Sequence, residues 1–304
     1  MQRVDLLSDL LRHSGLRKRV FTAGEIRVAE PQHFPCGRSF GLHVVSRGRL
    51  RIRAQDDGSE LRLGPGDIAL MARGCHHTLY AEAPQPGESQ ADARVLSAAY
   101  QLWSAPLHPF FSELPDWLVL RAEERLRLDS VGLLVDLISA ELAEPSPGSE
   151  SVLNGLLDAV FSYVLRALLL RCADRGPGFG RALRSEAIAR ALQLLHADVE
   201  RDWNLASLAR EVGLSRTALA NRFREQLDET PMGYLRRLRM LRASQRLLET
   251  DLPLERIASE VGYSDAFGFS KVFKKTLGKS PREFRRSELA PELAALRFEA
   301  RFAG

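Results

Sequence analysis

The sequence contains little cysteine, and its apolar residues are broken into short runs. Its three cysteines, Cys36, Cys75 and Cys172, lie far apart, and such an odd, sparse set is not typical of a secreted disulfide framework. No apolar run approaches the roughly 18 residues that a membrane span needs. The N-terminal stretch MQRVDLLSDLLRHSGLRKRV carries acidic residues within its apolar rows and does not resemble a secretory signal. We therefore expect a cytoplasmic protein with no membrane partner.

Charge is distributed unevenly, although 45% apolar and 27% charged residues are ordinary for a soluble globular protein. Residues 181–287 contain 21 Lys and Arg against 14 Asp and Glu, whereas the remainder contains 22 against 25. A basic C-terminal third beside a mildly acidic front is typical of a protein with a nucleic-acid-binding half. The length of 304 residues suggests two domains with separate cores.

Helix-like and strand-like stretches follow one another in blocks. Residues 5–16 carry leucines at helical spacing and predict a helix. Short β-rich runs over residues 20–103, separated by turns such as Gln55–Ser59, predict a barrel or a sandwich. Two apolar stretches at about 130–172 predict a helical hairpin. The segment CADRGPGFG, residues 172–180, is the predicted domain boundary, and the chain after it predicts helices separated by short turns.

One pattern occurs twice in the C-terminal third. LAREVGLSRTALANRFREQLDETP, residues 208–231, is repeated as IASEVGYSDAFGFSKVFKKTLGKSP, residues 257–281. The copies align at an offset of 49 as far as Ser215 and Ser264, and at 50 after one extra residue in the second copy. Matching Phe and Pro residues continue beyond this insertion, which indicates a true repeat.

Each copy has the layout of a helix-turn-helix motif. Gly213 and Gly262 are predicted to turn the chain at positive φ, and Ser215 and Ser264 are predicted to be the N-caps of the second helices. The outer faces of these second helices are expected to contact base edges and phosphates in the major groove. The predicted DNA-binding residues are Ser215, Arg216, Thr217, Ala220, Asn221, Arg222 and Arg224 in the first copy, and Ser264, Asp265, Ala266, Phe267, Gly268, Lys271, Lys274 and Lys275 in the second.

A long helix is predicted between the copies. Thr230 and Pro231 form an N-cap followed by proline at the first helical position, and an apolar stripe continues to Glu249. About 19 residues at 1.5 Å each span roughly 28 Å, close to the ~34 Å of one DNA turn. One chain would therefore place two recognition helices in successive major-groove segments. A capping box at residues 280–283 predicts a closing helix.

The run RMLRASQRLLETDLPLERIASEVGYSDAFGFSKVFKKTLGKSPREFR, residues 239–285, is similar to the signature of the AraC/XylS family of bacterial transcription regulators. The resemblance implies sequence-specific operator binding and activation through contact with RNA polymerase. By position it implies base contacts from Thr217, Ala220 and Asn221 in the first copy, and from Ala266, Phe267, Gly268 and Lys271 in the second.

The second copy departs from a pattern of direct base contacts. Ala266 and Gly268 cannot hydrogen-bond a base edge through a side chain, so we expect this copy to read DNA more by shape and phosphate contact. Two interpretations of Phe267 remain open, contact with a thymine methyl group or core packing beside Phe269. We expect the first copy to carry more of the base specificity.

Residues 1–172 resemble the cupin-type sensory domain of one branch of that family. The resemblance rests on DLLSD at residues 5–9, LHVVSRG at 42–48 and GDIALMARGCHH at 66–77. The barrel interior is the expected effector pocket, and the helical hairpin is the expected dimer surface. The domains we predict are a cupin-like effector-sensing and dimerisation domain at 1–172, a linker at 173–184, an AraC-type DNA-binding domain at 185–287 with helix-turn-helix units at about 205–227 and 254–277, and a tail at 288–304.

The front half lacks a full set of cupin metal ligands. No His-x-His pair with a trailing Glu is present, and a catalytic metal needs three or four ligands with an open position. We therefore interpret His43 and His77 as satisfied barrel residues that line the effector pocket together with Cys75. The alternatives are a divalent metal held by His43, His77 and a third group, and a redox sensor at Cys75.

The predicted fold is α+β with two domains, an N-terminal cupin-like β-barrel with a helical hairpin and an all-α C-terminal domain with two helix-turn-helix motifs. The predicted function is transcription activation controlled by a small molecule, with no catalysis and no required cofactor. The expected partners are double-stranded promoter DNA, RNA polymerase, the effector and a second copy of the chain. The alternatives are a redox- or metal-responsive regulator and, with less support, a cupin metalloenzyme with an accessory helical domain.

Overall fold

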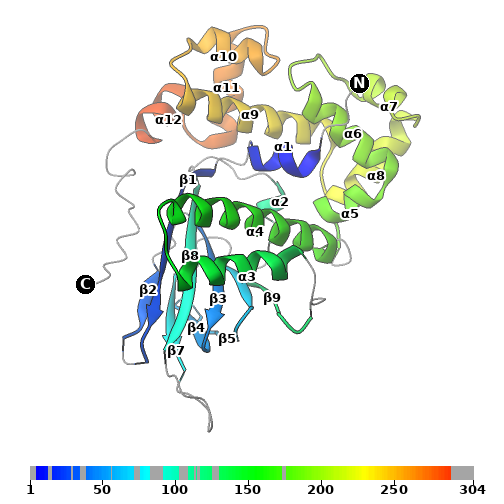
Figure 1. Ribbon diagram of the computed structural model, residues 1–304. Coiled ribbons are helices and arrows are strands. Elements are labelled where there is room, and N and C mark those ends of the chain that lie inside the picture. The colour runs from blue at the N-terminus through cyan, green and yellow to red at the C-terminus, as the bar shows by residue number, and fades with distance from the viewer. Residues whose placement is uncertain are drawn as a thin grey trace. The chain divides into compact units, whose positions relative to one another are not determined.

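The structure is a computed structural model that describes residues 5–12, 16–28, 30–34, 39–55, 57–71, 76–82, 92–102, 109–112, 114, 117–124, 130–172 and 176–288. These residues fall into two compact units (Figure 1). The sheet unit draws on Arg17–Leu102 and Leu114–Leu168. The helical unit draws on Met1–Leu16, Trp103–Glu113 and Leu169–Leu296.

The sheet unit is built from two sheets. Its strands are β1 (Leu16–Ile26), β2 (Gln32–Phe34), β3 (Ser39–Arg47), β4 (Leu50–Ala54), β5 (Glu60–Leu63), β6 (Ile68–Met71), β7 (His77–Ala81), β8 (Ala93–Leu102) and β9 (Trp117–Leu120). One sheet has the order β1-β8-β3-β6-β9 and the other β2-β7-β4-β5. Within the described strands no ladder joins the two sheets, so the predicted closed barrel is a pair of facing sheets held together by side-chain packing.

Alternation along β3 places successive side chains on opposite faces of its sheet. His43 and Val45 face the interior between the sheets, whereas Phe40 lies on the opposite face against Phe161. The interior is apolar, and its buried side chains come from both sheets. They include Ile26, Phe34, Val45, Leu50, Ile52, Leu63, Met71, Leu79 and Val95. The hairpin turn between β4 and β5 is confirmed, with Gly58 at φ 68.

The predicted helical hairpin is present as α3 (Ser130–Ala143) and α4 (Ser149–Cys172). It covers the outer face of the five-stranded sheet. The hydroxyl of Tyr100 in β8 donates to the carbonyl of Leu157 in α4 at 3.0 Å, and its ring stacks on Phe161 at 4.1 Å. Successive residues of β3 and β8 are therefore buried whichever face they point to, because α4 covers one face of the sheet and the second sheet covers the other.

Helix α4 contains no uninterrupted apolar run of membrane-spanning length, as expected, but it passes a looser test of length and mean composition. Residues Ser149–Leu170 pass that test by length and composition, with a mean hydropathy of 1.5, because Asp158 and Arg166 interrupt the apolar run without lowering the mean enough. The core helix of a soluble protein passes the same test. Because α4 buries Leu157 and Phe161 against a sheet, we interpret it as such a core helix.

The helical unit contains the remaining helices. They are α1 (Leu6–Arg12), α2 (Pro109–Ser112), α5 (Phe179–Arg184), α6 (Glu186–Ala197), α7 (Leu205–Glu211), α8 (Arg216–Leu227), α9 (Pro231–Glu249), α10 (Leu254–Glu260), α11 (Ala266–Leu277) and α12 (Pro281–Glu288). Two of them differ from expectation. The N-terminal helix α1 belongs to this unit, although its residues precede the sheets, and α5 lies within the segment predicted as a linker.

Candidate nucleic-acid interface

The first helix-turn-helix motif consists of α7 and α8 and has the predicted caps. Asn204 caps α7 in a capping box with Ser207. Gly213 turns the chain at φ 70, as predicted. Ser215 is then the N-cap of α8, and its hydroxyl accepts from the amide of Ala218 at 3.1 Å. The start of the first recognition helix is therefore fixed by the serine that the sequence indicated.

Helix α8 buries one face and exposes the other. Leu219 and Phe223 are fully buried, which anchors the helix to the rest of the unit. The opposite face carries the side chains predicted to contact DNA. Ser215, Arg216, Thr217, Asn221, Arg222 and Arg224 are exposed, and Ala220 is half-buried. This face offers guanidinium groups for phosphates together with amide and hydroxyl groups for base edges.

The second motif, α10 and α11, begins its recognition helix one residue later than predicted. The N-cap of α11 is Asp265 and not Ser264, and the Asp265 carboxylate accepts from the amide of Gly268 at 2.6 Å. The cause is the extra residue after Gly262, which lengthens the turn and leaves Ser264 exposed within it. A negative cap suits the positive end of the helix dipole. It also places a carboxylate on the face that is to approach phosphates.

The exposure of Phe267 separates its two interpretations. Phe269 and Phe273 are fully buried, whereas Phe267 is 83% exposed. Core packing of Phe267 is therefore wrong, and its apolar ring is available to a ligand. The other predicted contact residues of α11 share its accessible side. Asp265, Lys271, Lys274 and Lys275 are exposed, and Ala266 and Gly268 are half-buried.

Helix α9 joins the two motifs with the predicted length. It covers 19 residues from Pro231 to Glu249, and Thr230 caps it by accepting from the amide of Gly233 at 3.1 Å. The capping box that starts α12 is also present between Ser280 and Glu283. Hydrogen bonds from Ser280 hold the pKa of Glu283 below its usual value. The sequence therefore predicted the spacing element between the motifs.

Arg239 on α9 makes contacts that the sequence did not predict. Its guanidinium donates to the carbonyls of Val199 at 2.9 Å and Arg201 at 2.8 Å, which lie just before the first motif. The same guanidinium lies 5.7 Å from the ring centroid of Tyr263, in the turn of the second motif. Burial lowers the pKa of Arg239, while the nearby Tyr263 and Asp202 oppose that shift. Arg239 therefore connects both motifs to the helix between them.

Gly262 shows how closely the motifs approach one another. A Cβ atom at this position would lie 2.5 Å from the carbonyl oxygen of Glu200 and 2.5 Å from Nη2 of Arg239. The turn of the second motif therefore packs against the backbone that precedes the first. The two recognition helices belong to one packed body, and their spacing depends on this contact as well as on α9.

The sheet unit brings together the two histidines predicted at the effector pocket. His43 Nε2 and His77 Nε2 lie 2.7 Å apart, and His43 Nδ1 lies 2.8 Å from the hydroxyl of Ser97. Phe34 stacks on the ring of His77. Burial, and then the charge of His77, lower the pKa of His43 well below 6.5. The charged form of His43 is therefore disfavoured, and in its hydrogen bond with His77 one Nε2 donates and the other accepts.

The histidine pair does not by itself make a metal centre. The two facing Nε2 atoms are hydrogen-bonded to one another, and the pair supplies only two of the three or four ligands that a catalytic metal needs. Among the residues that the structure describes, no group of three or more His, Cys, Asp or Glu is placed to hold a metal ion. Cys75, the third residue of the predicted pocket, lies outside the described residues.

Comparison with known families covers both halves of the chain. Residues 5–169 match the family described as Cupin, and residues 208–287 match the family described as Helix-turn-helix domain. The first match covers more than half of the chain and includes α1, both sheets and most of the hairpin. The second begins within α7 and ends within α12.

Several curated proteins are similar over most of their length. The HTH-type transcriptional regulator AlkR of Acinetobacter baylyi is 30% identical, covering 80% of this chain and 86% of AlkR. A putative AraC-like transcription regulator of Streptomyces antibioticus is 26% identical, covering 93% of this chain and 97% of that protein. The RCS-specific HTH-type transcriptional activator RclR of Escherichia coli is 23% identical, covering 82% and 86%.

Proposed function

Because this chain belongs to the AraC family of helix-turn-helix transcription regulators and carries an N-terminal cupin domain, we propose that it activates transcription from a bipartite operator under the control of a small molecule. Members of this family are DNA-binding regulators and not enzymes, so the alternative of a cupin metalloenzyme is set aside. The proposal concerns the bipartite site, the effector and the direction of regulation.

The observation that carries the bipartite site is the packed pair of motifs. Both recognition helices expose basic side chains, and α9 with the Arg239 and Gly262 contacts fixes their separation. A helix of 19 residues spans roughly 28 Å, which suits two major-groove segments about 34 Å apart. One subunit would therefore read two half-sites on the same side of the duplex.

DNA binding by both motifs can be tested on the full chain. We expect Arg222→Ala and Lys274→Ala each to weaken operator binding about tenfold and to lower the salt slope by about one, because each removes one phosphate contact. Arg62→Ala is the matched control, since Arg62 is 80% exposed but lies in the sheet unit. Fluorescence anisotropy at several salt concentrations measures both quantities. Indifference of the affinity to both changes and to salt would contradict the proposal.

The interior of the sheet unit is the proposed effector site. His43, His77 and Ser97 place a few hydrogen-bonding groups in a largely apolar interior, which is the composition of a small-molecule site. Binding-site mapping across the genome of origin would identify neighbouring genes and hence candidate inducers. We expect calorimetry to detect one of them, and His77→Ala to abolish its binding while leaving operator affinity unchanged. Unaltered inducer binding by His77→Ala would show that the inducer does not bind at the histidine pair.

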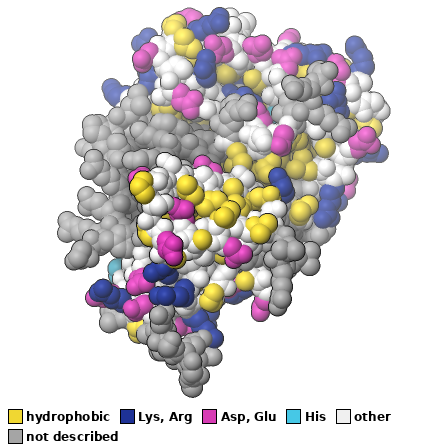
Figure 2. Space-filling model, viewed as in Figure 1, with side chains coloured by type: hydrophobic (Ala, Val, Ile, Leu, Met, Phe, Trp, Pro, Cys, Tyr) yellow, Lys and Arg dark blue, Asp and Glu magenta, His cyan; other side chains and the backbone are white. Residues whose placement is uncertain are grey.

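We propose a homodimer formed through α3 and α4. Figure 2 shows hydrophobic side chains gathered over this helical pair. Leu133, Leu137 and Val152 are 50%, 56% and 47% exposed, and a second copy would cover them. Sedimentation of the wild type and of Leu137→Asp tests the surface, because a buried charge at this position should dissociate the dimer. An unchanged sedimentation coefficient would exclude this interface.

Activation is proposed because the relative RclR is described as an activator. The expected partner is RNA polymerase, recruited beside the operator in the cytoplasm. Transcription in vitro from the mapped promoter, with purified polymerase and the full chain, should yield more transcript when the regulator and inducer are present. A decrease in transcript would make the protein a repressor.

A further inference from the structure

The N-terminal helix α1 is short, but several of its side chains are buried in the helical unit. Leu6 and Leu10 are 6% and 1% exposed, and α1 packs against α6. Asp5 stabilises its first turn by accepting from the amide of Leu7 at 3.1 Å and from the hydroxyl of Ser8 at 2.7 Å. A helix of seven residues is not stable by itself in water. Its structure therefore depends on docking to the DNA-binding helices.

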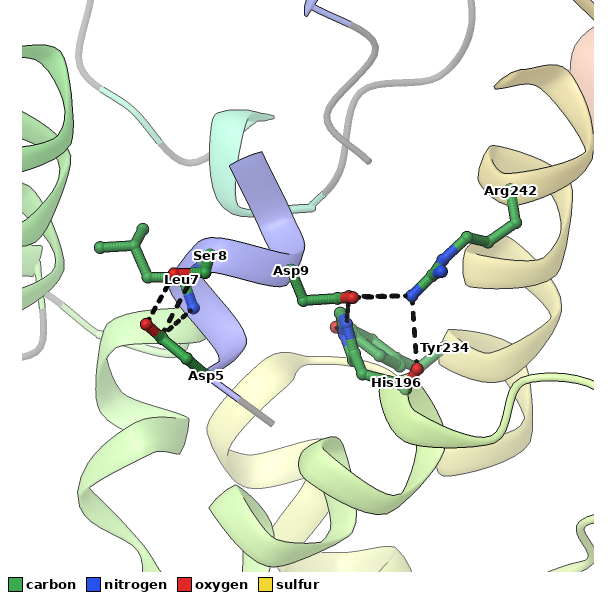
Figure 3. A network of polar contacts seen from close by, with 7 residues as sticks. All are labelled: Asp5, Leu7, Ser8, Asp9, His196, Tyr234 and Arg242. Carbon is green, nitrogen blue, oxygen red and sulfur yellow. Dashed lines mark hydrogen bonds and ion pairs between the residues drawn. The ribbon is translucent and has the colours of Figure 1, made fainter. Parts of the chain in front are cut away.

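Asp9 is the polar centre of this docking surface (Figure 3). Nη2 of Arg242, on α9, donates to both carboxylate oxygens at 3.0 and 2.9 Å. Nδ1 of His196, at the end of α6, donates to the same carboxylate at 2.6 Å. Asp9 is only 9% exposed, and a buried carboxylate is tolerated only where such partners compensate it. The surface is therefore specific for an acidic residue at this position of α1.

The contacts continue from Asp9 into the core of the first motif. Nε2 of His196 is hydrogen-bonded to the hydroxyl of Tyr234 at 2.7 Å. The ring of Tyr234 packs edge-on against Phe223, the buried anchor of recognition helix α8, at 5.8 Å between centroids. The second motif has a separate core, formed by Phe269, Phe273 and Phe284 with the apolar face of α9. The contacts from Asp9 through His196 and Tyr234 thus lead to the first recognition helix.

We propose that α1 is a brace for the first motif, and that its docking through Asp9 sets the affinity of that motif for its half-site. Undocking removes the carboxylate that both His196 and Arg242 contact and exposes the surface covered by Leu10. His196 then no longer holds the hydroxyl of Tyr234 in place, and the packing of Tyr234 against Phe223 of α8 loosens. Because DNA binds the ordered form of α8, the docked and DNA-bound states favour one another.

The test compares the same chemical change at two positions of α1 in the full chain. Asp9→Asn removes the buried charge, and Asp5→Asn removes an exposed charge while retaining a side chain that can cap the helix. We expect Asp9→Asn to weaken operator binding about tenfold, with loss of footprint protection in the first half-site alone. Footprints of Arg222→Ala and Lys274→Ala assign the half-sites. Asp5→Asn should bind as the wild type does.

Hydrogen exchange without DNA provides a second readout that does not rest on operator binding. We expect α8 of Asp9→Asn to exchange faster while α11 stays protected. In a double-mutant cycle of Asp9→Ala with Arg242→Ala, the double variant should lose little more affinity than either single variant.

Three results would overturn the brace. They are wild-type or tighter binding by Asp9→Asn, equal loosening of α8 and α11, and additive effects in the cycle. If the wild type itself failed to bind operator DNA, the proposed bipartite reading would fail, yet the exchange experiment would still test the brace.

Discussion

The two helix-turn-helix motifs share one backbone plan but fix it by different means. The first has side-chain caps on both helices and an open turn at Gly213, where nothing lies within 4 Å of an added Cβ. The second has no side-chain cap on α10, and its turn at Gly262 packs against Glu200 and Arg239. The first is therefore defined locally, by its own sequence, whereas the second depends on contact with the rest of the unit.

The exposed faces of the two recognition helices also differ in the chemical groups that they present. Helix α8 presents Thr217 and Asn221, which can hydrogen-bond bases, between arginines. Helix α11 presents Phe267 and lysines around two residues with little or no side chain. We therefore expect the first motif to read bases and the second to hold the duplex by phosphate contact and shape. Paired substitutions at equivalent positions can break or sharpen this comparison.

The largest difference is expected at the two turn glycines. Both have positive φ, which costs a non-glycine residue about 1–2 kcal/mol. Gly213→Ala should cost no more than that, whereas Gly262→Ala adds an overlap with backbone and Arg239 and should cost about 3 kcal/mol or more. Urea unfolding of the two variants measures the free energies. Equal losses would show that the contact between the motifs is not tight.

Base reading is the next comparison. Asn221→Ala should cost about 1–3 kcal/mol on the cognate operator and relax the preference at one base pair. Lys271→Ala should weaken binding to all sequences alike and lower the salt slope by about one. Affinities for operators substituted at each position would distinguish these effects. Substitutions that cost the same in both half-sites would show that the motifs share specificity equally.

Substitutions at the N-caps of the recognition helices are expected to have smaller effects on stability, and the change at Asp265 is expected to strengthen DNA binding. Ser215→Ala should destabilise α8 by about 1 kcal/mol. Asp265→Asn keeps a capping side chain but removes a negative charge from the DNA-facing side, so it should cost about 0.3–1 kcal/mol of stability through the lost helix-dipole interaction and tighten DNA binding severalfold. Thermal melting and operator titration check both. Weaker binding by Asp265→Asn would indicate that the carboxylate contacts DNA directly, for instance a cytosine amino group.

The smallest effect is expected where the recognition helices end. Gly278 ends α11 at φ 75, whereas Asp228 ends α8 at φ 53, the only positive-φ residue other than glycine in the described chain. Asp228→Gly should stabilise the protein by a few tenths to 1 kcal/mol, and Gly278→Ala should destabilise it by about 1 kcal/mol. A loss of stability in Asp228→Gly would mean that the carboxylate side chain has a stabilising role of its own.

Local signals predicted most of the helical unit because its helices begin and end at residues with known backbone preferences. Ser215, Thr230 and the two turn glycines each fixed a boundary that the structure confirms. The error at Ser264 arose because a one-residue insertion can fall on either side of a cap. The short β-rich runs separated by turns predicted a barrel or a sandwich, but whether the sheets close depends on hydrogen bonds between distant segments, which local sequence does not encode.

The contacts that escaped prediction all join distant parts of the chain. Arg239 reaches carbonyls about forty residues earlier, and in the sequence it resembles the other arginines of an arginine-rich amphipathic helix. In the sequence, Asp9 resembles a solvent-facing acid of an amphipathic helix, and no motif around His196 indicates a role for it. The sequence placed both His43 and His77 in the predicted pocket, but the hydrogen bond between them depends on the packing of the two sheets and was not predicted.

The pairing of Asp9 with Arg242 joins residues 233 positions apart, which has a consequence for synthesis. Because Arg242 is synthesised 233 residues after Asp9, α1 cannot dock until α9 has been made. Until then Leu6 and Leu10 have no surface of this unit to cover them. Contacts of such long range are slow to close, so the newly made regulator should acquire full operator affinity only after a measurable delay.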